Sequence, residues 1–167
     1  LGRRGTRGTP ARQRWDASGA LGATLPEGRE AIAAADFDGV EIVENGLLYS
    51  AGSPRQVRQM CADLGLAGTL FQPFRDFEGC RRDRLQKNLD RAERKFDLMQ
   101  ELGTDLVLVC SNVQADALGD EHLLVDDLRL LAEHAGKRGL RTGYQGLSWG
   151  RHLNTYQPGS IGRAPGR

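Results

Sequence analysis

Short apolar runs alternate along this chain with longer segments in which apolar residues recur every three or four positions. Apolar runs of about five residues bounded by turn residues predict buried β-strands, and the wider spacing predicts amphipathic helices. Strands are expected at 39–44, 68–72, 105–110 and 140–145. Strands that alternate with helices are typical of a parallel α/β sheet, either a doubly wound open sheet or a (β/α)8 barrel.

Helix-capping residues and apolar residues at helical spacing predict helices at 24–35, 54–64, 83–102 and 120–137. Thr24 and Ser53 each stand before an early proline, which favours a helix start. In the longest helix, one face is formed by Leu85, Leu89, Ala92, Phe96 and Met99. Pro73 is expected to end the second strand, because proline cannot donate to the ladder of a central strand.

Two absent sequence motifs and the length of the strand–helix units indicate the fold class. Neither of the glycine-rich phosphate motifs, GxGxxG or GxxxxGK[ST], is present, and each strand–helix unit takes about 28–38 residues. A whole barrel needs about 250 residues. The prediction is therefore an α/β fold of the (β/α)8 TIM-barrel type, present as roughly its first half with about four units. The barrel domain is expected at 24–156, between irregular segments at 1–23 and 157–167.

Charge and cysteine content narrow the class of protein. The net charge of +1 divides into +4 for residues 1–20, +2 for 155–167 and −5 for the remainder. A nucleic-acid-binding domain places its basic residues on a folded face, so no nucleic-acid partner is expected. No apolar run is long enough for a membrane span, and no secretory signal is expected. Scattered Cys61, Cys80 and Cys110 predict buried, reduced thiols and a cytoplasmic protein.

Polar residues follow each expected strand, at the edge where parallel α/β folds bind ligands. Arg75 could bind a carboxylate through its planar guanidinium, or pair with its neighbour Asp76. His152 could serve as an acid/base group, or be a surface histidine. Glu44 could contact a ligand, form an ion pair or be a solvated acid, and Asn112 could be a turn residue. His122 and His134, on an expected helix, are predicted to have no catalytic role.

Four stretches are more specific than ordinary core sequence: FDGVEIVEN (37–45), FQPFRDFEG (71–79), RAERKFDLMQELGTDLVLVCSN (91–112) and GYQGLSWGRHLNTY (143–156). They resemble bacterial 3-dehydroshikimate dehydratases, which belong to the xylose-isomerase-like, sugar-phosphate isomerase/epimerase group of TIM barrels. The resemblance implies a divalent metal (Mg2+, Mn2+ or Co2+) at the carboxyl face of the barrel. It also implies dehydration of 3-dehydroshikimate to protocatechuate in quinate/shikimate catabolism. Some family members carry a C-terminal dioxygenase-like domain.

The resemblance also implies site residues. The first metal ligand of the family, a glutamate, corresponds to Gln145 here, which keeps an oxygen donor but loses the negative charge that a hard divalent ion prefers. The remaining family ligands come from strands beyond residue 160, so weak metal binding or none is expected. His152 is the expected catalytic residue. Substrate contacts are expected from Glu44, Arg75, Asn112, Trp149 and Arg151.

Three functions remain open from the sequence. The first is a metal-dependent dehydratase by descent, expected to be inactive or impaired in this chain, with 3-dehydroshikimate as its small-molecule partner. The second is a non-catalytic half-barrel fragment, whose exposed sheet edges predict self-association. The third is a sugar-phosphate or keto-sugar isomerase or epimerase on the same fold, since fold alone does not determine function. The FRDFEG and WGRHLN stretches favour the dehydratase, through the resemblance alone.

Overall fold

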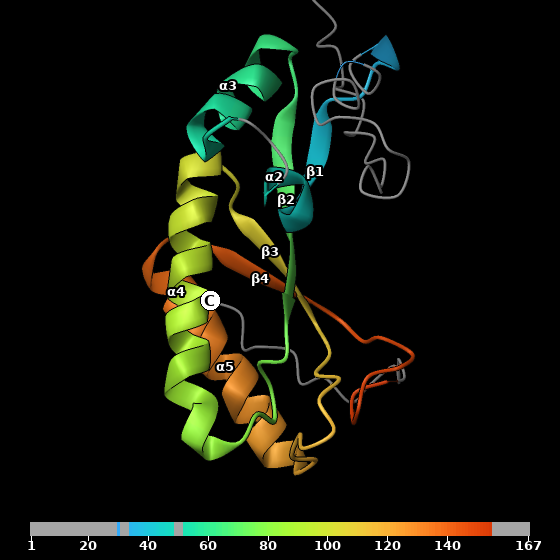
Figure 1. Ribbon diagram of the computed structural model, residues 1–167, viewed down its shortest axis with the longest axis vertical. Helices are drawn as coiled ribbons and strands as arrows, with labels where there is room; N and C mark the ends of the chain where they lie inside the picture. The colour runs from blue at the N-terminus through green and yellow to red at the C-terminus, as the bar shows by residue number, and fades with distance from the viewer. Residues whose placement is uncertain (1–29, 31–33, 49–51, 155–167) are drawn as a thin grey trace, which may run out of the picture. The chain divides into compact units, whose positions relative to one another are not determined.

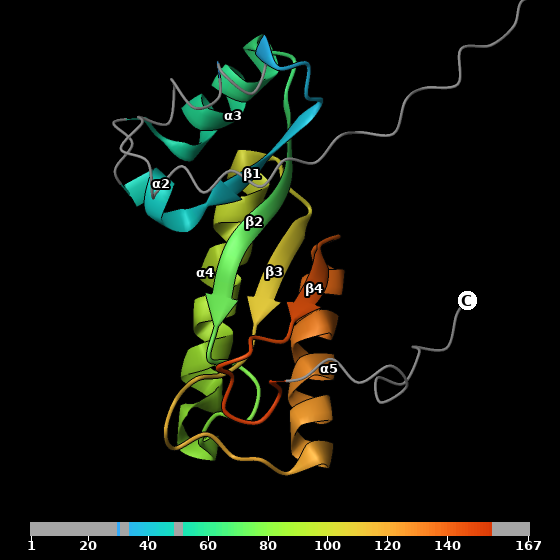
Figure 2. The same ribbon diagram turned by 90° about the vertical axis from the view of Figure 1, so that its right-hand side faces the viewer.

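The computed structural model describes residues 30, 34–48 and 52–154. Within these residues, four strands are hydrogen-bonded in chain order: β1 (Gly39–Val43), β2 (Ala67–Arg75), β3 (Leu106–Cys110) and β4 (Arg141–Gln145). The helices are α2 (Glu44–Leu48), α3 (Pro54–Asp63), α4 (Leu85–Leu102) and α5 (Glu121–Lys137), with a 3-10 turn η1 (Arg82–Arg84) directly before α4. The strands are parallel and alternate with helices, as Figures 1 and 2 show. The expected partial TIM barrel is confirmed.

The expected end of the second strand is wrong. Strand β2 continues through Pro73 to Arg75. Its pairing with β1 ends at Val43 opposite Gln72, so Pro73 lies beyond the β1 ladder. A residue without an N–H is tolerated where the neighbouring strand has ended. The FQPFR stretch therefore extends the strand rather than ending it.

The first strand ends one residue earlier than expected, and Glu44 begins the short helix α2 instead of closing the strand. The sequence did not predict this helix, because five residues are too few to show a helical period. The helix expected at 24–35 and both irregular segments lie for the most part outside the described residues, so these expectations stay predictions.

The chain divides into two compact units. The first consists of Leu1–Gln72 and Asp97–Leu106. Its described part contains a core cluster of Val40, Cys61 and Leu66, against which Phe37 and Leu64 pack. Helix α3 begins as its sequence predicted: the Ser53 hydroxyl accepts the Gln56 N–H, and the Gln56 side chain accepts the Ser53 N–H. This reciprocal capping box satisfies two backbone donors that a helix start leaves unpaired.

The second unit consists of Pro73–Phe96 and Val107–Arg167. Its described core is formed by apolar side chains from the end of β2, the segment after it, α4, β3 and α5, including Phe74, Phe77, Phe96, Val107, Val109 and Leu131. Helix α5 begins at its cap, where the Asp120 carboxylate accepts the Leu123 N–H at 3.0 Å. The stripes read from the sequence face this core, since Leu89, Ala92 and Ala135 are all buried.

The three cysteines, all within the described residues, are buried and form no disulfide, as expected. In the described part of the chain, no helix is both long and apolar enough to cross a membrane.

Candidate functional site

Within the second unit, the buried carboxyl group of Glu78 joins the segment after β2 to the ends of β3 and β4. Its Oε1 accepts the backbone N–H of Asn112 at 2.6 Å and the hydroxyl of Tyr144 at 2.9 Å. The Asn112 side-chain amide donates to the Glu78 carbonyl at 2.9 Å. The Glu78 side chain is only 1% exposed. One acidic residue therefore holds three segments together at the edge where a TIM barrel places its site.

The environment of Glu78 disfavours its charged form. The second oxygen, Oε2, is buried and has no hydrogen-bond partner among the described residues. Burial raises the pKa of Glu78, although the hydrogen bonds from Asn112 and Tyr144 act in the opposite direction. Burial also raises the pKa of Tyr144. A raised carboxyl pKa next to a site edge is typical both of acid catalysts and of buried structural acids.

The segment that follows β4 is fastened to the end of β3 through Ser111. The Ser111 hydroxyl accepts the Leu147 N–H at 2.8 Å and donates to the Leu153 carbonyl at 2.7 Å. The Arg151 N–H donates to the Asn112 carbonyl at 2.7 Å. At Gly150, an added Cβ would lie 2.7 Å from both Leu153 O and Ser111 Cβ. Residues 146–153 therefore form a docked loop rather than a free end.

The residues expected to carry chemistry occupy different parts of this arrangement. Gln145 is exposed at the end of β4, and the Cys110 thiol lies 3.7 Å from its Oε1. His152 is exposed, with Nε2 2.9 Å from the Ala117 carbonyl, and its ring lies against Gly119. Trp149 is 64% exposed. The docked loop thus brings Arg151 to Asn112 through the backbone, and the His152 ring to the β3–α5 connection.

Two further expected residues lie away from these contacts. Arg75 is exposed at the end of β2, and its carbonyl accepts an N–H of Arg91 at 3.1 Å. The Asp76 carboxylate, the alternative partner of Arg75, accepts the Val113 N–H and the Gln114 side-chain amide. Glu44 belongs to the first unit, where it begins α2 half-buried.

A divalent metal is the cofactor that the resemblance implies. Among the described residues, no group of three or more His, Cys, Asp or Glu side chains lies close enough together to hold an ion. Gln145 contributes a single neutral oxygen at this position, whereas hard divalent ions prefer several oxygen ligands that include carboxylates. The described residues therefore do not by themselves fit a Mg2+ or Mn2+ site.

Sequence reasoning missed the structural importance of Glu78, Tyr144 and Asp127. Asp127, on α5, is 3% exposed. Its carboxylate accepts the Gly79 N–H at 2.8 Å and two N–H groups of Arg82 at 2.7 Å each. The sequence signal for Glu78 and Asp127 was an acidic residue within a mainly apolar stretch, FEGC for Glu78 and LLVDDL for Asp127. Such a residue indicates a buried carboxyl group, but it does not name the partners.

A model of the xylose isomerase-like TIM barrel family matches residues 29–159, so the chain belongs to that family. More particularly, it is 85% identical over 145 residues to a 3-dehydroshikimate dehydratase of Pseudomonas putida. That match covers 87% of this chain and 23% of the relative, so the chain spans less than a quarter of the relative's length. The resemblance found in the sequence is confirmed.

Solved structures agree on the fold. One is a xylose isomerase-like TIM barrel/4-hydroxyphenylpyruvate dioxygenase fusion protein with 87% identity and a TM-score of 0.80, covering 82% of this chain and 22% of its own. Another is the IOLI protein, solved with a bound zinc atom, at 14% identity and a TM-score of 0.64. The aligned region is 73% of this chain and 46% of the IOLI chain, and at this identity the likeness shows the fold alone.

Proposed function

We propose that this chain is part of a 3-dehydroshikimate dehydratase, a lyase that converts 3-dehydroshikimate to protocatechuate in the cytoplasm. The observation that carries the proposal is the 85% identity to the Pseudomonas putida dehydratase over most of the chain. The residues assigned below belong to the stretches that carry the sequence resemblance, 37–45, 71–79, 91–112 and 143–156. We assign the barrel domain to residues 24–156.

The proposed roles follow the resemblance to the dehydratases. Arg75 and Arg151 are exposed cations that suit the carboxylate of the substrate. Glu44, Asn112 and Trp149 complete the proposed substrate contacts. His152 is the proposed acid/base group for loss of the α-proton and of hydroxide. In the present conformation its Nε2 faces the Ala117 carbonyl, so proton transfer at that atom requires the ring to leave this contact.

Gln145 is the proposed reason for low activity. A glutamine at the position of the family's first metal ligand removes one negative charge from the site. Since the described residues do not fit a metal site, we derive no step through a metal. The described residues are proposed to bind the substrate and to transfer protons. Polarisation of the substrate carbonyl by a Lewis acid is proposed to depend on groups outside the described residues.

The test is an assay for protocatechuate with 3-dehydroshikimate in the presence of Mg2+, Mn2+ or Co2+. The unaltered chain is expected to bind 3-dehydroshikimate in calorimetry with little or no turnover. Gln145→Glu is expected to tighten Mn2+ binding, because it restores a carboxylate. Gln100→Glu, an exposed change on α4 with the same charge, is the control and should leave Mn2+ binding unaltered.

Failure to bind 3-dehydroshikimate in both the unaltered chain and Gln145→Glu would overturn the proposal in favour of a non-catalytic half barrel. Sedimentation of the same samples tests the self-association expected of exposed sheet edges. A single monomeric species at micromolar concentration would contradict that expectation.

A further inference from the structure

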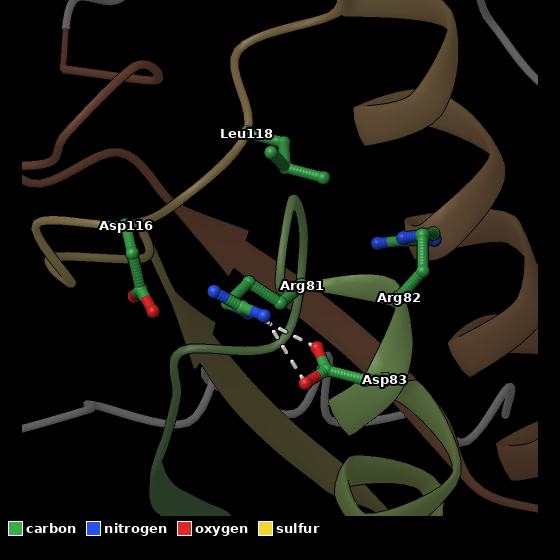
Figure 3. A pocket seen from close by; sticks show the side chains of 5 residues that line it. All are labelled: Arg81, Arg82, Asp83, Asp116 and Leu118. Atoms are coloured by element: carbon green, nitrogen blue, oxygen red, sulfur yellow. Dashed lines mark hydrogen bonds and ion pairs between the residues drawn. The ribbon is translucent and has the colours of Figure 1, made fainter.

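Two neighbouring cavities in the second unit share Arg81 and Asp116 on their walls. The first has a volume of about 440 Å³ and is lined by Arg81, Arg82, Asp83, Asp116 and Leu118. Figure 3 shows the Arg81 guanidinium turned toward Asp83, with hydrogen bonds of 3.1 and 3.3 Å. Arg82 is bound to Asp127. The lining charges of this cavity are therefore balanced, and it has no electrostatic preference for an ion.

The second cavity, of about 480 Å³, carries an excess of positive charge. Among the described residues that line it, there are four cations and two carboxylates: Arg81, Arg84, Lys87 and Arg91 against Asp76 and Asp116. Buried polar groups of Cys80, Asn88 and Asn112 also line it. A concave surface with one sign of charge raises the local concentration of ions of the opposite sign.

Two of the four cations have no carboxylate partner in the part of the chain that the structure describes. Arg84 pairs with Asp116 at 3.2 Å, and Arg81 pairs with Asp83. Among the described residues, Lys87 has no hydrogen-bond or ion-pair partner. Arg91 donates to two neutral oxygens, Asn88 Oδ1 at 2.8 Å and Arg75 O at 3.1 Å.

Asp76 does not neutralise these two cations through a direct contact. Its carboxylate oxygens accept the Val113 N–H at 3.0 Å and the Gln114 amide at 3.2 Å. The positive charges of Lys87 and Arg91 therefore face the cavity without a bonded counter-charge from the described residues.

The positions of the cations along the helix are unfavourable without an anion. Arg84, Lys87 and Arg91 are three and four residues apart, which places like charges on one helical face. Arg84 directly precedes the 18-residue helix α4 and Lys87 lies in its first turn, where the helix dipole disfavours cations. Arg81, at the cap position of the preceding 3-10 turn, makes no side-chain cap hydrogen bond. A bound anion offsets the repulsion between these like charges and their unfavourable interaction with the helix dipole.

We propose that the second cavity is a binding site for a small oxyanion with two negative charges, held by Lys87, Arg91 and Arg84. Phosphate and carboxylate groups share this chemistry: the Lys87 ammonium supplies a compact charge, and the guanidinium groups supply paired N–H donors. The volume of about 480 Å³ leaves room for the organic part of a phosphate ester or of a dicarboxylate. None of the three cations is among the residues assigned to the dehydration chemistry, although Asn112, a proposed substrate contact, also lines the cavity.

The test is calorimetric titration of the 167-residue chain with inorganic phosphate and, separately, with succinate, at an ionic strength held constant with NaCl. Saturable binding is expected. Lys87→Gln is expected to weaken it at least about threefold, which is the scale of one partly exposed charge pair. Arg94→Gln, an equal charge change on the exposed part of the same helix, should leave the affinity unaltered.

A third variant distinguishes loss of the site from loss of the fold. Asp116→Asn removes a lining carboxylate and releases Arg84, so binding should become tighter, which misfolding cannot produce. Binding of phosphate alone supports a phosphate ester as the ligand, and binding of succinate alone supports a dicarboxylate. No saturable binding of either, or equal effects of Lys87→Gln and Arg94→Gln, would overturn the proposal. The readout is binding rather than turnover, so its result is independent of the proposed dehydratase activity.

Discussion

Glu78 Oε1 lies 2.6 Å from the backbone nitrogen of Asn112, a residue 34 positions later in the chain. The same oxygen accepts the hydroxyl of Tyr144, 66 positions later. One buried carboxyl group thus links three chain segments of the second unit at the carboxyl end of the sheet. Its other oxygen is buried without a hydrogen-bond partner among the described residues, and burial of the group raises its pKa.

The first prediction concerns the pH dependence that Glu78 introduces. Burial raises its pKa in the folded protein above the ordinary value of 4.5, so the native state keeps a proton that the unfolded chain releases. The contribution of Glu78 to stability is therefore complete below pH 4.5 and is lost as the pH rises through the raised pKa. Glu78→Gln keeps an oxygen acceptor but cannot ionise, so it should gain stability relative to the unaltered chain as the pH rises.

Urea unfolding at a series of pH values from 4.5 upward measures this difference. Glu133→Gln, an exposed change on α5, is the control and should stay within about 0.5 kcal/mol of the unaltered chain. If the free energies of unfolding of Glu78→Gln and of the unaltered chain differ by a constant amount across the series, Glu78 is not the titrating group.

A second prediction concerns Asp127, which fastens α5 to the segment after β2. Removing its carboxylate by Asp127→Ala leaves the buried Gly79 N–H without its acceptor and the Arg82 guanidinium without its partner. Arg82 is 42% exposed, so water replaces part of what is lost. We expect a loss of about 2–3 kcal/mol in the free energy of unfolding.

The adjacent residue provides a matched control for Asp127. Asp126 pairs with Arg129, and both side chains are 72% exposed. Asp126→Ala should therefore cost less than about 1 kcal/mol in the same urea titration. Equal losses for the two variants would show that the buried carboxylate of Asp127 is no more important than a surface charge.

The contrast between Asp126 and Asp127 shows what the sequence could predict. Apolar periodicity predicted the four described strands and helices α3, α4 and α5, because burial of a strand or of a helical stripe leaves a local pattern. The family resemblance correctly indicated the partial barrel. The short helix at Glu44 and the continuation of β2 through Pro73 left no local pattern, and both predictions there were wrong.

The internal contacts of the candidate site were not predictable for a different reason. Glu78 meets Asn112 and Tyr144, and Ser111 meets Leu153, over separations of 34 to 66 residues. A single sequence contains no signal that pairs such positions. The strand-end rule nevertheless placed Asn112 and Gln145 at the correct edge of the sheet.

The third prediction concerns Gly79, whose backbone N–H is bound by Asp127. Its φ of 64° is one that residues with a side chain rarely adopt, and an added Cβ would collide with Leu118 O and lie 2.7 Å from Leu124 Cδ2. Gly79→Ala should cost more than about 3 kcal/mol in the free energy of unfolding, because strain and collision act together. Gly139→Ala, with a φ of 71° and nothing within 4 Å, carries the strain alone and should cost about 1–2 kcal/mol. Thermal or urea unfolding of the two variants compares them, and equal losses would refute the collision.

The last prediction has the opposite pH slope from that of Glu78. Glu93 on α4 contacts His134 Nδ1 at 2.7 Å and Arg138 Nη1 at 3.0 Å, both at the C-terminal end of α5. The hydrogen bond to His134, with that to Arg138, lowers the pKa of Glu93 below its ordinary value of 4.5. Its contribution to stability is therefore present above pH 4.5 and is lost as the pH falls through the lowered pKa.

Glu93→Gln should accordingly be about 0.5–1 kcal/mol less stable than the unaltered chain near neutral pH, a small value because its side chain is 39% exposed. The difference should shrink as the pH falls below 4.5, whereas the difference for Glu78→Gln grows as the pH rises above it. Glu101→Gln, exposed on the same helix, is the control for a general effect of removing a carboxylate. A general sensitivity of the fold to pH would change the stability differences of both variants in the same direction. Opposite slopes for the two variants, measured by urea unfolding in one set of buffers, are the result expected of two carboxyl groups with oppositely shifted pKa values, and parallel slopes would contradict both assignments.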